Sequence, residues 1–282
     1  NMIIAKTIKE VRENVKAWRA EGLKVGLVPT MGYLHEGHQS LIRRAVKEND
    51  RVVVSIFVNP LQFGENEDLD TYPRDFARDS KICASEGVSM VFHPSGHEMY
   101  NEGFCTFVDM TGLTETLCGK RRPGHFRGVC TVVSKLFNIV NPDRAYFGWK
   151  DAQQVAVIKR MVMDLNIDIE IVACETVRES DGLARSSRNV YLSSNERKAS
   201  TILQEALKVA EKKIASGVRS SHEIKEAMVE TISSVKEVKL DYAEIVDLKT
   251  LQPVSTIDGP TLVAAAIFIG GTRLIDNYIY GI

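Results

Sequence analysis

Short apolar runs alternate with longer amphipathic segments over the first part of the chain. The runs are rich in β-branched residues and apolar on both faces, as expected for strands buried inside a parallel sheet. Runs with this pattern occupy residues 24–28, 51–58, 88–92, 144–147 and 167–172. Segments with helical periodicity lie between them, at residues 38–49, 72–86, 131–141 and 152–166. This alternation predicts βαβ units with right-handed crossovers, and hence an α/β fold with a doubly wound, Rossmann-like parallel sheet.

The pattern changes after about residue 177. Capping-box sequences at residues 193–196 and 220–223 predict two helices, ending near residues 215 and 233. Strand-like runs then follow at residues 240–246, 261–268 and 273–280. Helices followed by strands predict a smaller α+β domain. We therefore expect a first domain over residues 1–176 that binds the ligands, and a C-terminal domain over residues 177–282 that acts as a lid.

Composition narrows the possible partners and the cellular compartment. The chain is 44% hydrophobic and 26% charged with a formal net charge of -1, so it has no positive field to attract nucleic acid or an anionic membrane. Its longest apolar run, near residues 262–270, is too short to span a bilayer and predicts a buried strand. The five cysteines are scattered without a C-x-x-C pair, which is typical of reduced thiols in the cytoplasm.

The stretch VPTMGYLHEGHQSL, residues 28–41, carries two histidines where the first predicted strand leads into its helix. This is the carboxyl edge of the sheet, where doubly wound folds bind ligands. Gly32 and Gly37 allow close approach of the backbone, and a helix N-terminus offers N–H groups that attract phosphate. His35 and His38 would donate hydrogen bonds to phosphate oxygens, whose charge favours the protonated ring. The stretch therefore predicts a phosphate site.

Two other interpretations of the histidine pair stay open. The zinc-protease motif spaces its histidines four apart with Glu between them and needs a further ligand, whereas here the spacing is three and Gly37 occupies the middle. His93 and His97 fall in a different strand-end loop. The simplest alternative is a pair of surface or helix-capping histidines.

Polar residues follow two other predicted strands, and the ends of parallel strands face one crevice. Asn59 and Gln62 follow the second strand, and Lys150, Asp151 and Gln154 follow the strand at 144–147. Lysine suits phosphate, aspartate can accept bonds from ribose hydroxyls, and the two glutamines fit a substrate with hydroxyl and carboxylate groups. Ordinary helix capping or a solvated helix start would explain the same residues without a ligand.

Two basic loops complete the candidates. Arg185, Ser186, Ser187 and Arg188 lie in DGLARSSRN, a loop suited to holding a triphosphate, although a charged linker has the same composition. A second loop, residues 118–129, contains a basic cluster whose role charge alone does not assign. Its members are Lys120, Arg121, Arg122 and Arg127.

Together these stretches resemble the pantothenate synthetase family, ligases that join pantoate to β-alanine at the expense of ATP. PTMGYLHEGH, FVNPLQFG, RPGHFRGV, FGWKDAQQ and DGLARSSRN match that family's blocks in order, and the resemblance runs from about Ile3 to the C-terminus. The first block is also similar to the histidine signature of nucleotidylyltransferases and class I aminoacyl-tRNA synthetases. The resemblance implies a Rossmann-like enzyme that works as a homodimer.

The resemblance also implies roles for individual positions. Implied ATP contacts are Met31, Gly32, Tyr33, Leu34, His35, Glu36, Gly37, His38, Gly148, Trp149, Lys150, Asp151, Val177, Arg185, Ser186, Ser187 and Arg188. His38 matches the position assigned as proton donor, and Gln62 and Gln154 match the pantoate contacts. Pro29, Met31 and Phe63 are the nearest candidates for a recess around pantoate's methyl groups. Trp149 stands where many members of the family have Glu, and Arg185 where many have Met or another side chain. Backbone contacts are expected at both positions, and the departures leave the side-chain roles open.

The implied reaction forms pantoyl adenylate from pantoate and ATP, and β-alanine then displaces AMP. His35, His38, Lys150, Ser187 and Arg188 would stabilise phosphoryl charge, with Mg²⁺ bound through the ATP phosphates. An adenylyltransferase acting on another small acid or phosphate, and a non-catalytic nucleotide-binding module, are the alternatives. A tRNA synthetase fits least, because the chain is short and has no basic excess.

Overall fold

The computed structural model describes residues 1–282, which form two compact units. The first comprises Asn1–Met110, Arg122–Trp149 and Val157–Glu175, and the second Thr111–Arg121, Lys150–Ala156 and Thr176–Ile282. Two short segments of the range expected for the first domain therefore pack with the C-terminal part of the chain. The role of that part as a lid stays a prediction.

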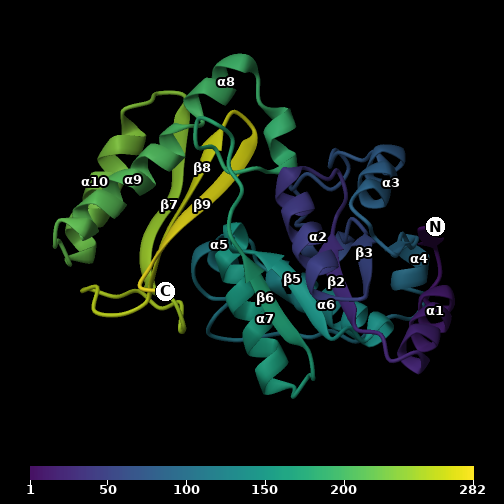
Figure 1. Ribbon diagram of the computed structural model, residues 1–282. Helices are drawn as coiled ribbons and strands as arrows, with labels where there is room; N and C mark the ends of the chain where they lie inside the picture. The colour runs from purple at the N-terminus through teal and green to yellow at the C-terminus, as the bar shows by residue number, and fades with distance from the viewer. The chain divides into compact units, whose positions relative to one another are not determined.

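The first unit is built on a sheet of six parallel strands in the order β1-β4-β3-β2-β5-β6 (Figure 1). The strands are β1 (Ile3–Ala5), β2 (Val25–Thr30), β3 (Arg51–Ile56), β4 (Met90–Phe92), β5 (Arg144–Gly148) and β6 (Glu170–Cys174). The chain runs outward from β2 through β3 in one direction, whereas β5 lies on the other side of β2. The predicted doubly wound sheet is confirmed, and its topological switch point lies between β2 and β5.

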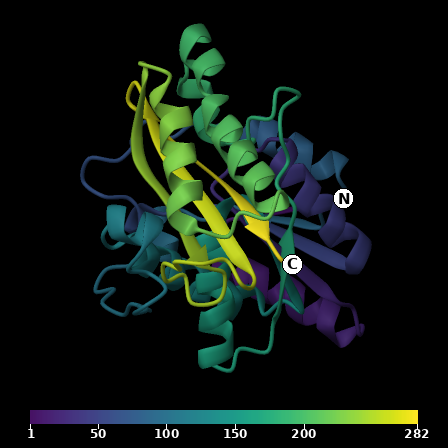
Figure 2. The ribbon, with the colours of Figure 1, turned by 90° about the vertical axis from the view of Figure 1, so that its left-hand side faces the viewer.

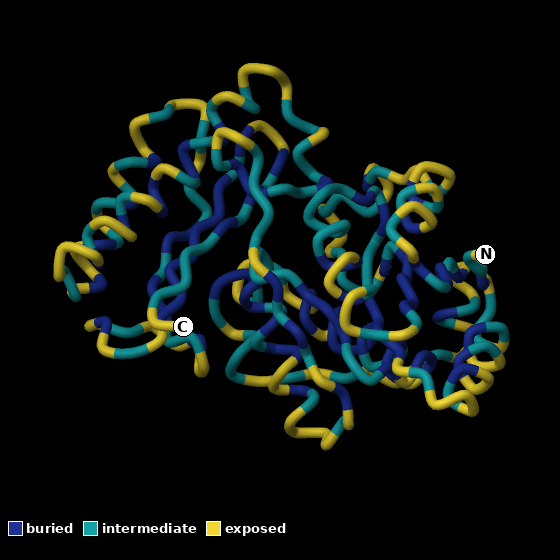
Figure 3. The backbone as a smooth tube through the Cα atoms, in the orientation of Figure 1, coloured by how far each residue is buried: buried dark blue, intermediate teal, exposed yellow.

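Helices flank this sheet, and their apolar faces pack against it to form the core. They are α1 (Ile8–Ala20), α2 (Glu36–Glu48), α3 (Phe76–Ser85), α4 (Gly96–Met99), α6 (His125–Val140) and α7 (Ala152–Asp164). A 3-10 turn, η1 (Pro60–Gln62), follows β3. The first residues of α7 belong to the second unit. Helix α2 packs on β2, β3 and β5, and its buried Leu41, Ile42 and Ala45 join an apolar cluster with residues of these strands. In Figure 3 the buried residues are dark blue, and those of β2, β3 and β5 form the buried centre of this sheet.

Strand β1, helix α1 and the short helices α4 and α5 (Leu117–Arg121) were not predicted, and helix α6 begins earlier than predicted. Helix α1 buries Val11, Val15 and Trp18 on one face, and most of its other residues are charged. Helix α6 begins at His125, six positions before the predicted start at residue 131, because Gly124 adopts a left-handed conformation (φ 80°) directly before it. The early start matters for the site, because the first turn of α6 contacts η1.

The second unit contains an antiparallel sheet in the order β7-β8-β9 with helices against one face (Figure 2). Its elements are α5 (Leu117–Arg121), α8 (Ser194–Ala199), α9 (Ile202–Ala215), α10 (Ser221–Ser233), β7 (Val238–Asp247), β8 (Thr261–Ile269) and β9 (Thr272–Tyr280). Strand β8 is almost wholly buried, which confirms the interpretation of the long apolar run. No helix of the structure combines the length and apolar character needed to cross a membrane.

The helix predicted from residue 193 to about 215 is divided into α8 and α9. Its start is confirmed, since Ser193 and Glu196 form a reciprocal capping box. The division falls at Ser200 and Thr201, whose hydroxyls donate to the carbonyls of Arg197 (2.6 Å) and Lys198 (3.0 Å). Hydroxyl groups that bond the preceding turn compete with the helical backbone, which accounts for the break.

Candidate active site

The two histidines cap the first turn of α2, directly after β2. His35 is the N-cap residue, and its Nδ1 accepts a hydrogen bond from the Gly37 N–H at 3.0 Å. The Nδ1 of His38 accepts from the His35 N–H at 3.2 Å, so the pair forms a reciprocal capping box. The ring centroids are 4.0 Å apart. The capping interpretation is therefore confirmed as a structural role, and it leaves open what the other edge of each ring does.

These contacts determine which ring nitrogen carries hydrogen. A backbone N–H can donate only to an unprotonated nitrogen, so in this geometry both rings are neutral and carry hydrogen on Nε2. Each Nε2–H is then a donor held at a fixed orientation beside the N-terminus of α2, which also attracts anions. A proton on Nδ1 would break the cap, so the expectation that phosphate favours a protonated ring requires this cap to open, and it stays a prediction.

The turn between β2 and α2 has an unusual backbone. Gly32 and Tyr33 both have positive φ, 80° and 51°, and Leu34 is fully buried. A Cβ on Gly32 would lie 2.9 Å from a methyl group of Ile56, so the turn lies directly on the end of β3. The side chain of Glu36 pairs with Arg43, which leaves the backbone of Glu36 for a nucleotide contact.

A buried carboxylate below this turn escaped the sequence analysis. Asp79 of α3 is 1% exposed and accepts hydrogen bonds from the Tyr33 and Leu34 N–H groups, both at 2.8 Å. Burial raises the pKa of Asp79 above its ordinary value, although both N–H bonds act in the opposite direction. One signal was available: Asp79 lies on the same face of the helix as Phe76 and Cys83, which places an acid among inward-facing positions.

Gln62 belongs to η1, which follows β3 and is held by α6. Asn59, itself 1% exposed, donates from Nδ2 to Gln62 Oε1 at 3.0 Å and to the Gly128 carbonyl at 3.1 Å. His125 Nδ1 lies 2.9 Å from the Gln62 carbonyl oxygen. The amide of Gln62 is therefore oriented by its neighbours, while Phe63 continues the loop with its ring edge-on to Tyr72. Sequence analysis found Asn59 and Gln62 but had no signal for the part that α6 plays.

The basic cluster at residues 118–129 does not form one patch. Arg122 makes a close ion pair with Glu67, 2.6 Å apart, within the first unit. Burial alone would raise the pKa of Glu67, but the Arg122 hydrogen bonds and charge outweigh it and hold the pKa below its usual range. Arg127 lies over the Phe107 ring at 3.9 Å, and in the second unit Arg121 pairs with Asp241 at 3.4 Å. These arginines have separate packing roles.

Two further predicted positions, Gly148 and Trp149, lie at the carboxyl end of β5. This is the same edge of the first unit's sheet as the turn after β2. Gly148 is the last residue of β5, which pairs with β2 through Gly26↔Arg144 and Leu27↔Ala145. Trp149 follows, with the Lys159 ammonium 5.2 Å from its ring centroid. In the first unit the structure thus brings the Met31–His38 turn and the end of β5 to one edge of neighbouring strands, as the sequence predicted.

Lys150, Asp151 and Gln154 belong to the second unit. The Lys150 carbonyl accepts a hydrogen bond from Asn277 of β9 at 3.0 Å, and its ammonium lies 3.7 Å from Asp151. The adjacent Gln153 is 5% exposed, and its amide bonds the backbone of Leu113, Thr116 and Cys118. Gln154 is half-buried. Of the two glutamines, Gln153 serves the fold, which supports the choice of Gln154 as the substrate candidate.

The serine-rich loop of the second unit is braced by three ion pairs. Arg178 makes a bidentate contact with buried Asp276 of β9 (2.6 and 2.9 Å), and Arg197 does the same with Asp181 (2.8 and 3.0 Å). Arg185 pairs with Glu179 at 3.1 Å. This pair reduces the case for Arg185 as a triphosphate contact through its side chain, as its departure from the family pattern also suggests.

The loop end carries the remaining candidates. Val177 accepts a hydrogen bond from the Arg185 N–H at 2.9 Å, and Ser186 caps a 3-10 turn by accepting from the Arg188 N–H at 3.2 Å. Ser187 is 6% exposed. The second unit therefore gathers Val177, Arg185, Ser186, Ser187 and Arg188 into one ordered loop.

No group of three or more His, Cys, Asp or Glu side chains in the structure is arranged to hold a metal ion. His93, one of the other histidines considered, lies 3.0 Å from the Ile56 carbonyl through Nδ1 and stacks on Phe76.

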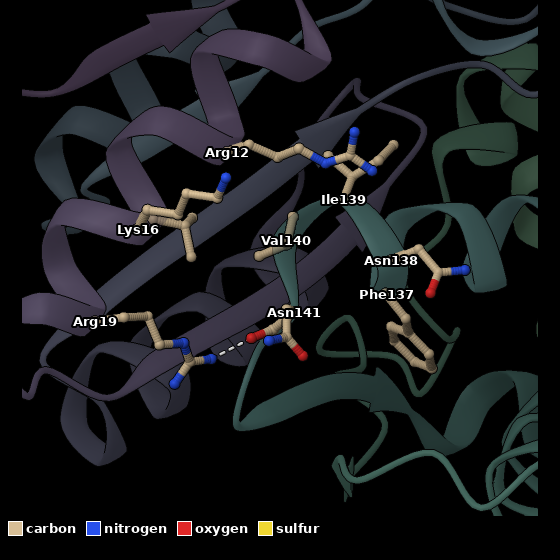
Figure 4. Close-up of a pocket in the computed structure, with 9 residues that line it drawn as sticks. Arg12, Lys16, Arg19, Phe137, Asn138, Ile139, Val140 and Asn141 are labelled. Atoms are coloured by element: carbon tan, nitrogen blue, oxygen red, sulfur yellow. Dashed lines mark hydrogen bonds between the residues drawn. The ribbon is translucent and has the colours of Figure 1, made fainter.

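A groove of about 530 Å³ on the first unit lies apart from all the predicted site residues (Figure 4). It is lined by one face of α1, with Arg12, Lys16 and Arg19, and by the C-terminal end of α6. Arg19 bonds the Asn141 carbonyl and forms an ion pair with Asp143 at 2.8 Å. This arrangement ties α1 to the loop that leads into β5.

The parallel doubly wound sheet, with a glycine- and histidine-containing turn at its switch point, defines a nucleotide-binding α/β enzyme. A sequence profile described as Pantoate-beta-alanine ligase matches residues 3–279. The chain belongs to this family and is, as the resemblance implied, a pantoate–β-alanine ligase.

Individual relatives agree over the full length. A pantothenate synthetase of Enterococcus faecalis is 60% identical over 279 residues, which cover 99% of both chains. The crystal structure of pantothenate synthetase from Thermus thermophilus has a TM-score of 0.92 at 46% identity, covering 98% of this chain and 99% of the other. A Francisella tularensis pantoate-beta-alanine ligase, solved in complex with Beta-gamma ATP and Beta-alanine, has a TM-score of 0.82 at 36% identity, covering 99% and 98%.

Proposed function

We propose that the chain condenses (R)-pantoate with β-alanine in two steps, through an enzyme-bound pantoyl adenylate. In the first step a carboxylate oxygen of pantoate attacks the α-phosphorus of ATP, and pyrophosphate leaves. In the second step the neutral amine of β-alanine attacks the acyl carbon, AMP leaves, and the amine loses a proton. AMP is already a good leaving group, so the reaction needs no acyl-enzyme nucleophile. The observation that carries the proposal is the histidine capping box at the switch-point edge of the sheet.

The Met31–His38 turn is the proposed ATP-binding element of the first unit. His35 and His38 would donate from Nε2 to phosphate oxygens as negative charge builds up on them, and the helix N-terminus adds its own N–H groups. Because the cap holds both rings before ATP arrives, little reorganisation is required during the reaction. This pre-organisation supports assigning His38 as a hydrogen-bond donor to the phosphate oxygens.

The remaining phosphate contacts are proposed residue by residue. Lys150, Ser187 and Arg188 carry the donors and positive charge that a developing pyrophosphate requires. The backbone of Gly148, Trp149, Asp151, Val177, Arg185 and Ser186 completes the proposed set of nucleotide contacts. Mg²⁺ bound to the ATP phosphates would neutralise part of their charge, and removing it with EDTA should abolish adenylate formation.

Pantoate is assigned to the glutamines. The amide of Gln62 can donate to the carboxylate and accept from a hydroxyl, and its orientation is set by Asn59. Gln154 has the same bonding capacity. Pro29, Met31 and Phe63 are the proposed apolar contacts for the two methyl groups.

Pantoate-dependent exchange of labelled pyrophosphate into ATP, measured without β-alanine, tests the proposal. Reversible adenylate formation predicts exchange that requires both pantoate and Mg²⁺, and addition of β-alanine should then release AMP and pantothenate in equal amounts. Exchange that depends on a different acid would contradict the assigned substrate, and ATP binding without exchange for any small acid would contradict the enzyme assignment.

We further propose that the protein is a homodimer and that the segment around Phe107 belongs to its interface. Residues 105–107 are exposed, belong to no strand and carry an aromatic ring that is 39% exposed. The Arg127 guanidinium lies over one face of this ring, and the Val108 N–H donates a hydrogen bond to Thr131 Oγ1 at 3.0 Å. These contacts fix the position of the segment. Sedimentation equilibrium should give twice the chain mass of 31.4 kDa. Phe107→Asp should weaken the dimer, whereas a monomeric wild-type protein would contradict the proposal.

A cytoplasmic location is proposed from the cysteines. All five are free thiols, and four of them, Cys83, Cys118, Cys130 and Cys174, are buried. Burial raises the pKa of the Cys83 thiol to about 12 and that of Cys130 likewise to about 12, so these groups are unreactive. Free thiols of this kind are typical of proteins in a reducing compartment.

A further inference from the structure

We propose that Asp79 is a positioning residue for catalysis: its carboxylate holds the backbone of Tyr33 and Leu34, and so fixes the helix start that carries His35 and His38. The inference rests on the proposed role of the Met31–His38 turn in binding ATP. Asp79 comes from α3, so it would act on the nucleotide only through the turn that it supports.

The contacts of Asp79 are directed at two consecutive backbone groups. Oδ2 accepts from the Tyr33 N–H and Oδ1 accepts from the Leu34 N–H, at 2.8 Å each, across 46 and 45 positions of sequence. The side chain is 1% exposed, and burying a carboxylate is unfavourable unless hydrogen bonds compensate for the lost water. Both oxygens are thus committed to the turn, and the turn has both of its amide groups satisfied.

The turn needs such support because its backbone is one that L-residues seldom adopt. Tyr33 has φ 51°, in the left-handed region where a Cβ approaches the following carbonyl. A Cβ on Gly32, which has φ 80°, would lie 2.9 Å from Ile56 Cγ2 and 3.1 Å from Asp79 Oδ2, so a side chain there would have to displace its neighbours. Without the carboxylate, the two N–H groups would lose their partner and the turn would relax toward ordinary backbone angles.

Displacement of this turn would also displace the rings of His35 and His38. Leu34 is fully buried and immediately precedes His35, the N-cap of α2. The His35 N–H is the donor that holds the His38 ring, so a shift of one residue changes the orientation of both Nε2–H groups. Asp79 therefore controls the geometry of the phosphate donors without contacting them.

Two variants and a matched control test the inference. Asp79→Asn keeps one acceptor for the two N–H groups, and Asp79→Ala keeps none. Asp75→Asn removes a charge from the same helix but preserves the cap, because Asn can still accept from the Arg78 N–H as Asp75 does at 3.1 Å. Pyrophosphate exchange gives kcat and KM for ATP and pantoate, and hydrogen–deuterium exchange mass spectrometry reports the protection of the peptide that contains residues 32–38.

We expect kcat/KM for ATP to fall by about tenfold in Asp79→Asn and further in Asp79→Ala. The KM for pantoate should stay within about twofold, because Gln62 is held by Asn59 and α6. The peptide at residues 32–38 should lose protection in both variants but not in Asp75→Asn. A purely structural role would reduce the folded fraction and leave both KM values unchanged, so that result would overturn the inference. Unaltered loop protection in folded Asp79→Ala would also overturn it. Failure of the proposed function is separately visible as absence of exchange in the wild-type enzyme.

Discussion

Replacement of His38 by Ala should reduce pantoate-dependent pyrophosphate exchange by about 10²-fold or more, because the Nε2–H donor to phosphate is lost. The same change removes the acceptor of the His35 N–H, so Ala alone cannot separate catalysis from capping. His38→Asn and His38→Gln can separate the two roles. The Asn Oδ1 replaces the capping Nδ1 but supplies no donor at the Nε2 position, whereas the Gln amide nitrogen approaches the Nε2 position and leaves the cap unfilled.

A catalytic donor predicts that His38→Asn is nearly as impaired as His38→Ala while it loses less stability. The difference in stability should be about 0.5–1 kcal/mol, the usual contribution of a helix cap. His38→Gln should retain more exchange activity than either of the other two variants. Normal exchange in His38→Asn would mean that the imidazole only caps α2, and the proposed role of His38 in phosphate binding would be wrong. Thermal unfolding of each variant shows whether activity is compared between equally folded proteins.

Local pattern was enough to predict most of the fold. Strands such as β3 and β8 are apolar on both faces, and that property is independent of what packs on them. Helix α1 was missed although its signal is present in the sequence: Val11, Val15 and Trp18 recur at helical spacing among charged residues. The boundary of α6 was wrong because it depends on the left-handed backbone of Gly124, and the break at Ser200 depends on a hydroxyl bond to the preceding turn. Neither feature appears in apolar periodicity.

The site was predictable only where its residues are close in sequence. His35 and His38 are three apart and share one turn, so their spacing, neighbouring glycines and position after a strand all indicated the same place. Asn59 and Gln62 were found in the same way. By contrast, Asp79 contacts Leu34 across 45 positions, and Asn59 contacts Gly128 across 69. Contacts of this length depend on how strands and helices pack, which one sequence without its fold does not contain.

Gly128→Ala should strongly lower kcat/KM for pantoate, although Gly128 lies inside helix α6 and is not one of the predicted site residues. In an exposed helix, Gly→Ala usually stabilises by about 0.5–1 kcal/mol. Here a Cβ would lie 2.3 Å from the Leu61 carbonyl oxygen and 2.5 Å from the Gln62 nitrogen, both backbone atoms that cannot move aside by changing rotamer. The clash therefore outweighs helix propensity, and we expect a net loss of about 1–3 kcal/mol in the free energy of unfolding.

The clash also falls on the segment that carries the proposed pantoate contact. Displacement of Gln62 by about 1 Å should lower kcat/KM for pantoate by about 10²-fold while KM for ATP changes little. Gly96→Ala is the matched control, since a Cβ at that helical glycine meets no atom within 4 Å. Pyrophosphate exchange at varied pantoate, corrected for the folded fraction from thermal unfolding, measures the effect. If Gly128→Ala matched Gly96→Ala in kcat/KM for pantoate, the η1 segment would tolerate displacement and Gln62 could not be the group that orients the substrate.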